Sequence, residues 1–257
     1  MKILLTGSRG FIGTQIFKTL TERGYNIDGV DQGDAVPDVK YDFILHFGAR
    51  TLIRNSLSAP HEYFMDGLAL TMKYLELARN SGATIVYPTS GSVEEATNPY
   101  SLSKKQGVEW INLYRKLYNV KAVVLKLYNI YGESSRKGAV YLFSKAALEQ
   151  GEIPVYGGGR QVRDFVHVSD LVKCVMRIVD GQISPGDYEI GTGVGTSVLD
   201  LINIIESVSG KKIFAVDHEF ILDEAPALFA KKPLPIDPLP IREGVKRVIE
   251  EISRSMR

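Results

Sequence analysis

A tyrosine and a lysine four residues apart give the clearest chemical signal in this 257-residue sequence. Tyr100 and Lys104 open an amphipathic segment, so on a helix their side chains lie on one face. A nearby ammonium lowers the pKa of a phenol, which would let Tyr100 lose and regain a proton near neutral pH. The same spacing also occurs at exposed helix starts with a solvated lysine. Alone, the pair leaves both interpretations open.

Two hydroxyl residues precede this pair at the end of a predicted strand. Thr89 and Ser90 close the apolar run 83–90, ten residues before Tyr100. In open parallel sheets ligands collect outside the carboxyl ends of the strands, so reactive hydroxyls belong there. Either hydroxyl could hydrogen-bond a reacting oxygen.

The first 31 residues predict the elements that would present a cofactor to these groups. An apolar run leads into Gly7, Gly10 and Gly13, then a helix-period segment and a second apolar run ending at Asp31. Strand, tight turn, helix and strand in this order are typical of dinucleotide binding, because glycines permit the turn and the close approach of a pyrophosphate. The helix N-terminus favours a phosphate, and Asp31 can accept ribose hydroxyls. With these elements upstream, the tyrosine and lysine favour catalysis.

The choice of dinucleotide depends on two charged residues. Asp31 favours NAD, because a carboxylate there would repel a 2′-phosphate. Arg9, on the glycine turn, could contact such a phosphate; a solvated arginine, or one that faces the pyrophosphate, is the alternative.

The stretch TGSRGFIG resembles the extended short-chain dehydrogenases/reductases, and the chain is similar to their NAD-dependent epimerase/dehydratase family, in particular to nucleotide-sugar 4-epimerases. Matching stretches follow at 46–49, 56–60, 126–132 and 153–172, and the resemblance covers about residues 1–208. It implies an α/β fold, a Rossmann-like doubly wound parallel sheet with a small C-terminal substrate-binding lobe. We expect residues 1–135 to form the NAD-binding domain, with returning segments near 160–180, and 136–257 to form mainly the nucleotide-sugar lobe.

The resemblance also implies roles for individual residues. The catalytic residues would be Ser90, Tyr100 and Lys104. The cofactor-binding residues would be Gly7, Arg9, Gly10, Phe11, Ile12, Gly13, Asp31, Gln32, Phe47, Gly48, Ala49, Tyr100, Lys104 and Tyr128. The substrate-binding residues would be Thr89, Ser90, Asn129, Val140, Tyr156 and Arg163. Asn129 and the planar fork of Arg163 are expected at the substrate's diphosphate, whereas His46, Asp164 and His167 are interpreted as framework.

The residues after Ser90 bear on the reaction type. Family members that eliminate water resemble one another in an Asp-Glu pair there, and decarboxylating members in a nearby glutamate; this chain has Gly91 and Ser92. An epimerase needs no such carboxyl group: Tyr100 takes the C4 hydroxyl proton, hydride goes to NAD, and the 4-keto sugar takes the hydride back on its other face. Two alternatives stay open, a reductase of nucleotide-linked 4-keto sugars that uses NADH or NADPH, and a non-catalytic protein that binds a nucleotide sugar or a dinucleotide.

Two departures from the family concern the supporting elements. Only eleven residues separate Asp31 from the next apolar run, 43–47, where the family has a helix and a third strand. A smaller sheet and a barer adenine pocket are expected. Asp66 and Gly67 replace the asparagines of the following long helix, about 61–81, so the active-site strand must be supported differently.

Composition excludes several classes of protein. A net charge of +1, with 31 basic and 30 acidic residues, gives no footprint for nucleic acid or an acidic membrane. The single cysteine, Cys174, excludes an internal disulfide and a cysteine-based metal cluster, and we expect no metal. No apolar run approaches about 20 residues, and the N-terminus begins a strand. We expect a cytoplasmic protein whose partner is a nucleotide-diphosphate sugar; the resemblance adds a homodimer formed through helices at about 61–81 and 100–118.

Overall fold

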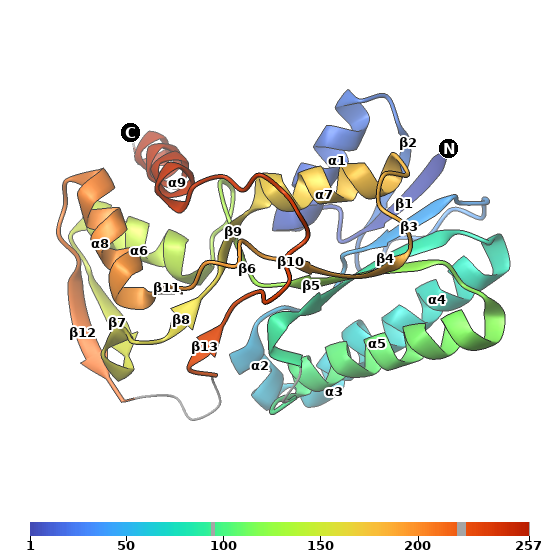
Figure 1. The fold of residues 1–257 in the computed structure, drawn as a ribbon, viewed down its shortest axis with the longest axis horizontal. Helices are drawn as coiled ribbons and strands as arrows, with labels where there is room; N and C mark the ends of the chain where they lie inside the picture. The colour runs from blue at the N-terminus through green and yellow to red at the C-terminus, as the bar shows by residue number, and fades with distance from the viewer. Residues whose placement is uncertain (94–95, 220–224, 257) are drawn as a thin grey trace. The chain divides into compact units, whose positions relative to one another are not determined.

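The computed structural model describes residues 1–93, 96–219 and 225–256, and the chain divides into two compact units (Figure 1). The first unit comprises Met1–Leu127 and Val172–Tyr188, and the second comprises Tyr128–Leu171 and Glu189–Arg257.

A six-stranded sheet with the order β10-β5-β4-β3-β1-β2 forms the centre of the first unit. Its strands are β1 (Lys2–Thr6), β2 (Asn26–Val30), β3 (Phe43–His46), β4 (Thr84–Ser90), β5 (Ala122–Leu127) and β10 (Gly186–Ile190). The pairs from β5 across to β2 are all parallel. Strands buried on both faces explain the continuous apolar runs of β1 and β4. The predicted Rossmann-like parallel sheet is confirmed.

The chain reverses direction across this sheet at β1. From β1 it proceeds to β2 on one side, then returns to β3, which pairs with the other side of β1 in the register Thr6 to His46. Loops leaving the carboxyl ends of β1 and β3 therefore diverge, and a crevice opens between them. The glycine turn and the 47–49 segment both start at this point.

Helices cover both faces of the sheet (Figure 1). One face carries α1 (Phe11–Glu22) and α7 (Val168–Val179). The other carries α4 (Leu70–Ser81) and α5 (Pro99–Tyr118), preceded in the chain by α2 (Ile53–Ser58), α3 (Pro60–Tyr63) and the π-helical turn η1 (Phe64–Ala69). Leu75 of α4 and Ile111 of α5 pack against Ile44 and Ile85 in one buried cluster. This packing fixes α5, and with it Tyr100 and Lys104, on the sheet.

The long helix expected over 61–81 is present: α3, η1 and α4 follow one another without a gap from 60 to 81, with a π-helical turn at η1. At the π-helical turn, Thr71 donates its hydroxyl to the carbonyl of Gly67 at 2.7 Å. A Cβ on Gly67 would lie 3.2 Å from Cβ of Ser103, so the glycine lets this turn lie close against α5. Such single-turn distortions often mark functional sites.

Residues 31–42, all of them described, form neither helix nor strand. The expectation drawn from the short spacing is confirmed for this segment, and β1 and β3 pair directly beside it.

The second unit is built around three helices. They are α6 (Gly138–Glu149), α8 (Val198–Ser209) and α9 (Ile241–Ser255), and they enclose a core that includes Phe143, Leu201 and Val248. Short strand pairs complete the unit: β6 (Asn129–Tyr131) with β9 (Phe165–His167), β7 (Glu152–Tyr156) with β12 (Phe214–His218), and β8 (Val162–Arg163) between β11 (Thr196–Ser197) and β13 (Ala227–Leu228). The short turns η2 (Gly91–Val93), in the first unit, and η3 (Gly157–Gly159), in the second, follow β4 and β7. Among the helices that the structure describes, none has the length and hydropathy to cross a membrane.

Candidate active site

The glycine turn after β1 leaves room that other residues would fill. Gly7 has φ +71°, and a Cβ on it would lie 2.8 Å from Cα of Gly48. A Cβ on Gly13 would lie 1.9 Å from the carbonyl oxygen of Gly7. Gly10 is the N-cap of α1 and has no side chain to cap it, so the first N–H groups of the helix are left for another acceptor. The turn fits a bound pyrophosphate, and Phe11 and Ile12 form the first helical residues behind it.

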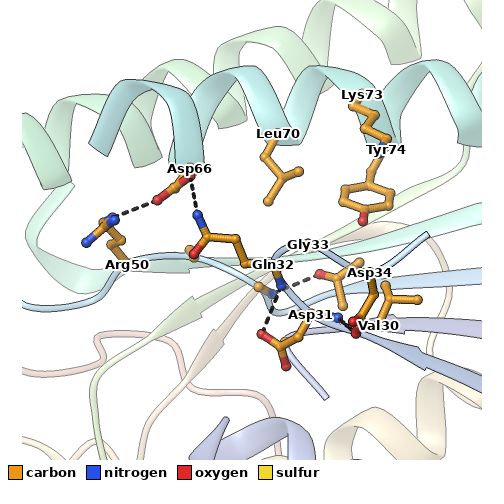
Figure 2. A pocket seen from close by; sticks show the side chains of 14 residues that line it. Val30, Asp31, Gln32, Gly33, Asp34, Arg50, Asp66, Leu70, Lys73 and Tyr74 are labelled. Atoms are coloured by element: carbon orange, nitrogen blue, oxygen red, sulfur yellow. Dashed lines mark hydrogen bonds and ion pairs between the residues drawn. The ribbon is translucent and has the colours of Figure 1, made fainter. Parts of the chain in front are cut away.

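A pocket of about 230 Å³ opens beside this turn (Figure 2). It is lined by Thr6, Gly7, Val30, Asp31, Gln32, Gly33, Asp34, Gly48, Ala49, Arg50, Asp66, Leu70, Lys73 and Tyr74. Of the expected cofactor residues, Gly7, Asp31, Gln32, Gly48 and Ala49 meet here, at the carboxyl ends of β1, β2 and β3. Phe47 and Arg9 are not among the lining residues.

The wall that α4 and η1 contribute was not foreseen from the sequence. Leu70 and Tyr74 project from the helix toward the loop that follows β2 (Figure 2), and Lys73 of the same helix also lines the pocket. Asp66 accepts from Arg50 Nε at 2.6 Å and from Gln32 Nε2 at 3.5 Å. The spacing 66, 70, 73 and 74 is that of one helical face, and this was the signal in the sequence. These residues supply a wall for an adenosine-sized group where the 31–42 segment is too short to do so.

Hydroxyl groups gather where β4 ends. Ser90 Oγ lies 2.9 Å from Ser92 Oγ, which lies 3.3 Å from Ser101 Oγ. The hydroxyl of Thr89 is buried and has no hydrogen-bond partner within the described parts of the chain. A buried polar atom without a partner is costly, so Thr89 is available to a bound molecule.

Tyr100 is held at the first turn of α5. Asn98 caps this helix by accepting from the backbone N–H of Ser101 at 2.9 Å. Burial raises the pKa of Tyr100, a hydrogen bond with Ser90 lowers it in part, and the neighbouring Tyr63 raises it. The rings of Tyr63 and Tyr100 meet edge to face with centroids 6.4 Å apart. The prediction that Lys104 lowers the pKa of this phenol is wrong for this structure, because burial dominates.

Lys104 is buried one turn further along α5, at 7 % exposure. Its ammonium donates to the carbonyl of Pro88 at 2.9 Å and lies 4.7 Å from the ring centroid of Tyr87. Burial lowers the pKa of Lys104 to about 8. The ammonium is therefore held by β4, and it stays mostly charged at neutral pH.

His46 is a satisfied core residue, as expected. Burial lowers its pKa to about 3, so the ring is neutral. Nδ1 lies 2.8 Å from the hydroxyl of Thr6, and Nε2 lies 3.2 Å from that of Thr71. Because Thr71 donates to Gly67, Nε2 carries the proton and Thr6 donates to Nδ1; Thr6 in turn accepts from the N–H of Gly48 at 2.9 Å. These hydrogen bonds tie β1 and β3 to the start of α4.

The four expected substrate residues of the second unit differ in burial and in hydrogen bonding. Asn129 begins β6, and its side-chain nitrogen is buried without a partner among the described residues. Arg163 Nη1 donates to the carbonyls of Val162 and Ala225 at 2.9 and 3.0 Å. Val140 is buried in the core between helices, and Tyr156 packs its ring near His218, with centroids 5.5 Å apart. Asn129 thus offers an unused donor, whereas Val140 serves the packing of α6.

Three other residues of this unit form its framework. Asp164 accepts from the backbone N–H groups of Thr192, Gly193 and Ala230 at 2.9 to 3.2 Å. His167 lies 2.8 Å from Glu133 Oε2 and from Ser169 Oγ. Tyr128, expected at the cofactor, donates its hydroxyl to Glu189 at 3.0 Å. The framework interpretation of Asp164 and His167 is confirmed.

Comparison with known proteins agrees with this geometry. The sequence profile described as the NAD dependent epimerase/dehydratase family matches residues 3–191. The chain belongs to this family.

Three similar proteins match this chain over nearly its whole length and over nearly the whole of their own. A provisionally named UDP-glucose 4-epimerase of Methanocaldococcus jannaschii is 29 % identical, with 99 % of each chain covered. The UDP-glucuronate 4-epimerase of Thermodesulfobacterium geofontis is 25 % identical over 96 % of this chain and 94 % of its own. The crystal structure of the Thermotoga maritima UDP-glucose 4-epimerase with UDP-glucose superposes with a TM-score of 0.89 at 21 % identity, covering 100 % of both chains.

Proposed function

We propose that this chain is a nucleotide-sugar epimerase that oxidises and re-reduces C4 of a nucleotide-linked hexose. The observation that carries the proposal is the placement of Tyr100 and Lys104 one turn apart at the start of α5, where the Ser90 hydroxyl at the end of β4 is near enough to lower the pKa of Tyr100. No carboxyl group follows Ser90 directly, because Gly91 and Ser92 stand there. The described residues thus include the groups for moving one hydroxyl proton, and the two that follow Ser90, Gly91 and Ser92, supply no acid for eliminating water.

The residues present fit NAD, judged by the glycine turn that a Cβ would fill and by Asp31 at the wall of the adjoining pocket. Gly7, Gly10 and Gly13 would hold the pyrophosphate, and Asp31 the adenosine ribose. NAD supplies the acceptor and donor of hydride at the sugar carbon.

The chain's own residues would then handle the proton. Deprotonated Tyr100 accepts the C4 hydroxyl proton and later returns it, while Ser90 donates a hydrogen bond to the same oxygen. Burial raises the pKa of Tyr100, so the deprotonated form depends on the Ser90 hydroxyl, which lowers that pKa. The charged Lys104, one turn further along α5, is proposed to hold the nicotinamide ribose.

A UDP-linked hexose is the first substrate to test. The relatives above carry UDP-glucose and UDP-glucuronate in their names. In the second unit, the unpartnered amide of Asn129 and the guanidinium of Arg163 are the proposed donors to the diphosphate. Tyr156 is kept as a proposed contact of the nucleotide sugar, whereas Val140, buried in the core of the second unit, is not.

The test is incubation of the purified protein, without added cofactor, with UDP-, GDP-, dTDP- and CDP-hexoses, reading sugars by NMR and mass spectrometry. An isomer of unchanged mass supports an epimerase with retained NAD. Turnover of 4-keto sugars alone, and only with added NADH or NADPH, would instead identify the reductase. Binding without turnover of either kind would identify the non-catalytic protein.

We also propose a homodimer formed through the helices of the first unit, and a cytoplasmic location. The homodimer rests on apolar side chains that α5 exposes, among them Leu113 and Leu117.

A further inference from the structure

Arg9 is the one side chain of the glycine turn that carries a positive charge. Its backbone N–H donates to Asp31 Oδ2 at 2.8 Å. Its guanidinium, however, is directed at a second carboxylate: Nη1 lies 2.7 Å from Asp34 Oδ2, and Nε lies 3.9 Å from Asp31 Oδ2. The arginine therefore lies between two carboxylates.

Asp34 is held in place by the turn that follows β2. The same Oδ2 accepts the backbone N–H of Asp31 at 2.8 Å, and the N–H of Asp34 donates to the carbonyl of Asp31 at 3.0 Å. Gly33, with φ +89°, permits this reversal of the chain. The turn is possible because residues 31–42 contain no helix, and it brings Asp34 to the wall of the pocket beside Asp31 (Figure 2).

Charge counting at this corner gives two carboxylates against one guanidinium. The hydrogen bond from Arg9 keeps the pKa of Asp34 below its usual value, so this carboxylate is ionised at neutral pH. A phosphate on the 2′-oxygen of the adenosine ribose would need the guanidinium as its counter-ion. That group is already paired with Asp34; of the cations that line the pocket, Arg50 is paired with Asp66 and Lys73 lies on α4, across the pocket from this turn.

We propose that Asp34 is a specificity-determining residue: it engages Arg9 and thereby selects NAD against NADP, in addition to any selection by Asp31. The inference deepens the proposed function and rests on it for the use of a dinucleotide. Arg9 is then a latent phosphate ligand that the neighbouring carboxylate keeps occupied.

The test measures which dinucleotide the purified protein retains. Each variant is incubated with equal, saturating NAD⁺ and NADP⁺, freed of unbound nucleotide by gel filtration and denatured in acid; the released nucleotides are quantified by mass spectrometry. Asp34→Asn keeps an oxygen for the N–H of Asp31 but removes the charge. We expect its NADP-to-NAD ratio to rise about tenfold over wild type, the size expected for a charge-assisted contact made available to a phosphate.

Two further variants separate the cause. The double variant Arg9→Gln/Asp34→Asn should return the NADP-to-NAD ratio to the wild-type value, because the guanidinium itself binds the phosphate. Asp38→Asn, a change of equal charge in the same segment but outside the pocket lining, should leave the ratio at the wild-type value.

The proposal is overturned if Asp34→Asn stays within twofold of wild type, or if the double variant retains the full gain. Should Asp34→Asn fail to fold, Arg9→Gln alone decides: the proposal requires a ratio no higher than wild type, and a rise contradicts it. Retention of nucleotide is measured without any sugar, so a protein that shows the ratio change but epimerises nothing would contradict the proposed function and leave this inference standing.

Discussion

The phenol of half-buried Tyr100 differs from that of an exposed tyrosine, because desolvation raises its pKa while the Ser90 hydroxyl lowers it in part. Replacing Tyr100 with Phe removes one oxygen and leaves the ring to pack against Tyr63. We expect turnover to fall by about 10²- to 10⁴-fold, the usual range for loss of a general acid–base group, with the content of bound NAD unchanged. Product formation by NMR and nucleotide release in acid measure the two quantities. Turnover at the wild-type rate would contradict the assigned role.

The buried ammonium of Lys104 should cost stability. Burial lowers its pKa to about 8, below the value in an unfolded chain, so below pH 8 the folded state carries the full desolvation penalty. As pH rises from 8 past the unfolded value, the unfolded chain binds more protons than the folded one and the penalty disappears. Lys104→Met should therefore raise the free energy of unfolding at pH 7, by at most about 3 kcal/mol, and abolish turnover.

Urea unfolding at pH 7 and near pH 10.5 measures this gain, which should shrink at the higher pH. Lys105→Met is the matched control, because the neighbouring side chain is exposed; we expect a change of less than about 0.5 kcal/mol. A Lys104→Met variant less stable than wild type at pH 7 would show that the contacts with Pro88 and Tyr87 outweigh desolvation.

Residue types and spacing revealed part of this site. Ser90, Tyr100 and Lys104 could be singled out because a strand end and one helical turn relate them, and the structure has both elements. The direction of the pKa shift of Tyr100 was predicted wrongly, since burial depends on side chains from distant parts of the chain, such as Tyr63. The pairing of Arg9 with Asp34 was also missed, because it depends on a turn at Gly33 that no regular period indicates.

Among the elements, α5 matters most, because its first turn presents Tyr100. Asn98 caps that turn, and Asn98→Ala should cost about 1 kcal/mol of unfolding free energy and lower kcat more than it changes KM, because the turn frays. Ser197→Ala is the matched control: Ser197 caps α8 in the second unit by accepting from the N–H of Asp200 at 3.0 Å. It should cost a similar amount of stability and leave kcat unchanged. Equal kcat losses in both variants would attribute the effect to global destabilisation.

An element could be predicted from the sequence where residues close together in the chain determine it. The glycine turn, β4 and α5 follow from local patterns of glycine, apolar runs and helical period. The π-helical turn η1 within the long helix does not, because it lies where Gly67 packs against Ser103 and where Thr71 donates its hydroxyl to the carbonyl of Gly67. The wall of the pocket on α4 has the right period in the sequence, yet its function depends on the absence of a helix in 31–42.

At the scale of the whole molecule, the division of chemistry between the units follows the fold. The crevice beside β1 and β3, the glycine turn and the proton-transfer residues all belong to the first unit. The second unit contributes the unpartnered amide of Asn129 on a framework fixed by Asp164. The sequence could predict which unit binds the cofactor and which the sugar nucleotide, because each has its own motifs. It could not predict the side-chain contacts that hold each unit together.

The exposed apolar stripe on α5 carries the last prediction. Leu102, Trp110, Leu113 and Leu117 recur with helical period and are 46, 39, 41 and 57 % exposed. Scattered exposed leucines need no explanation, but a stripe along a 20-residue helix is typical of an interface.

With a second copy of the chain as the proposed occupant of this stripe, Leu113→Lys/Leu117→Lys should place charges in a desolvated contact and convert a dimer into a monomer at micromolar concentration. Sedimentation velocity measures the mass; Val194→Lys, which is 63 % exposed in the second unit, should sediment like wild type. A monomeric wild-type protein, or a dimer that survives both lysines, would contradict this interface.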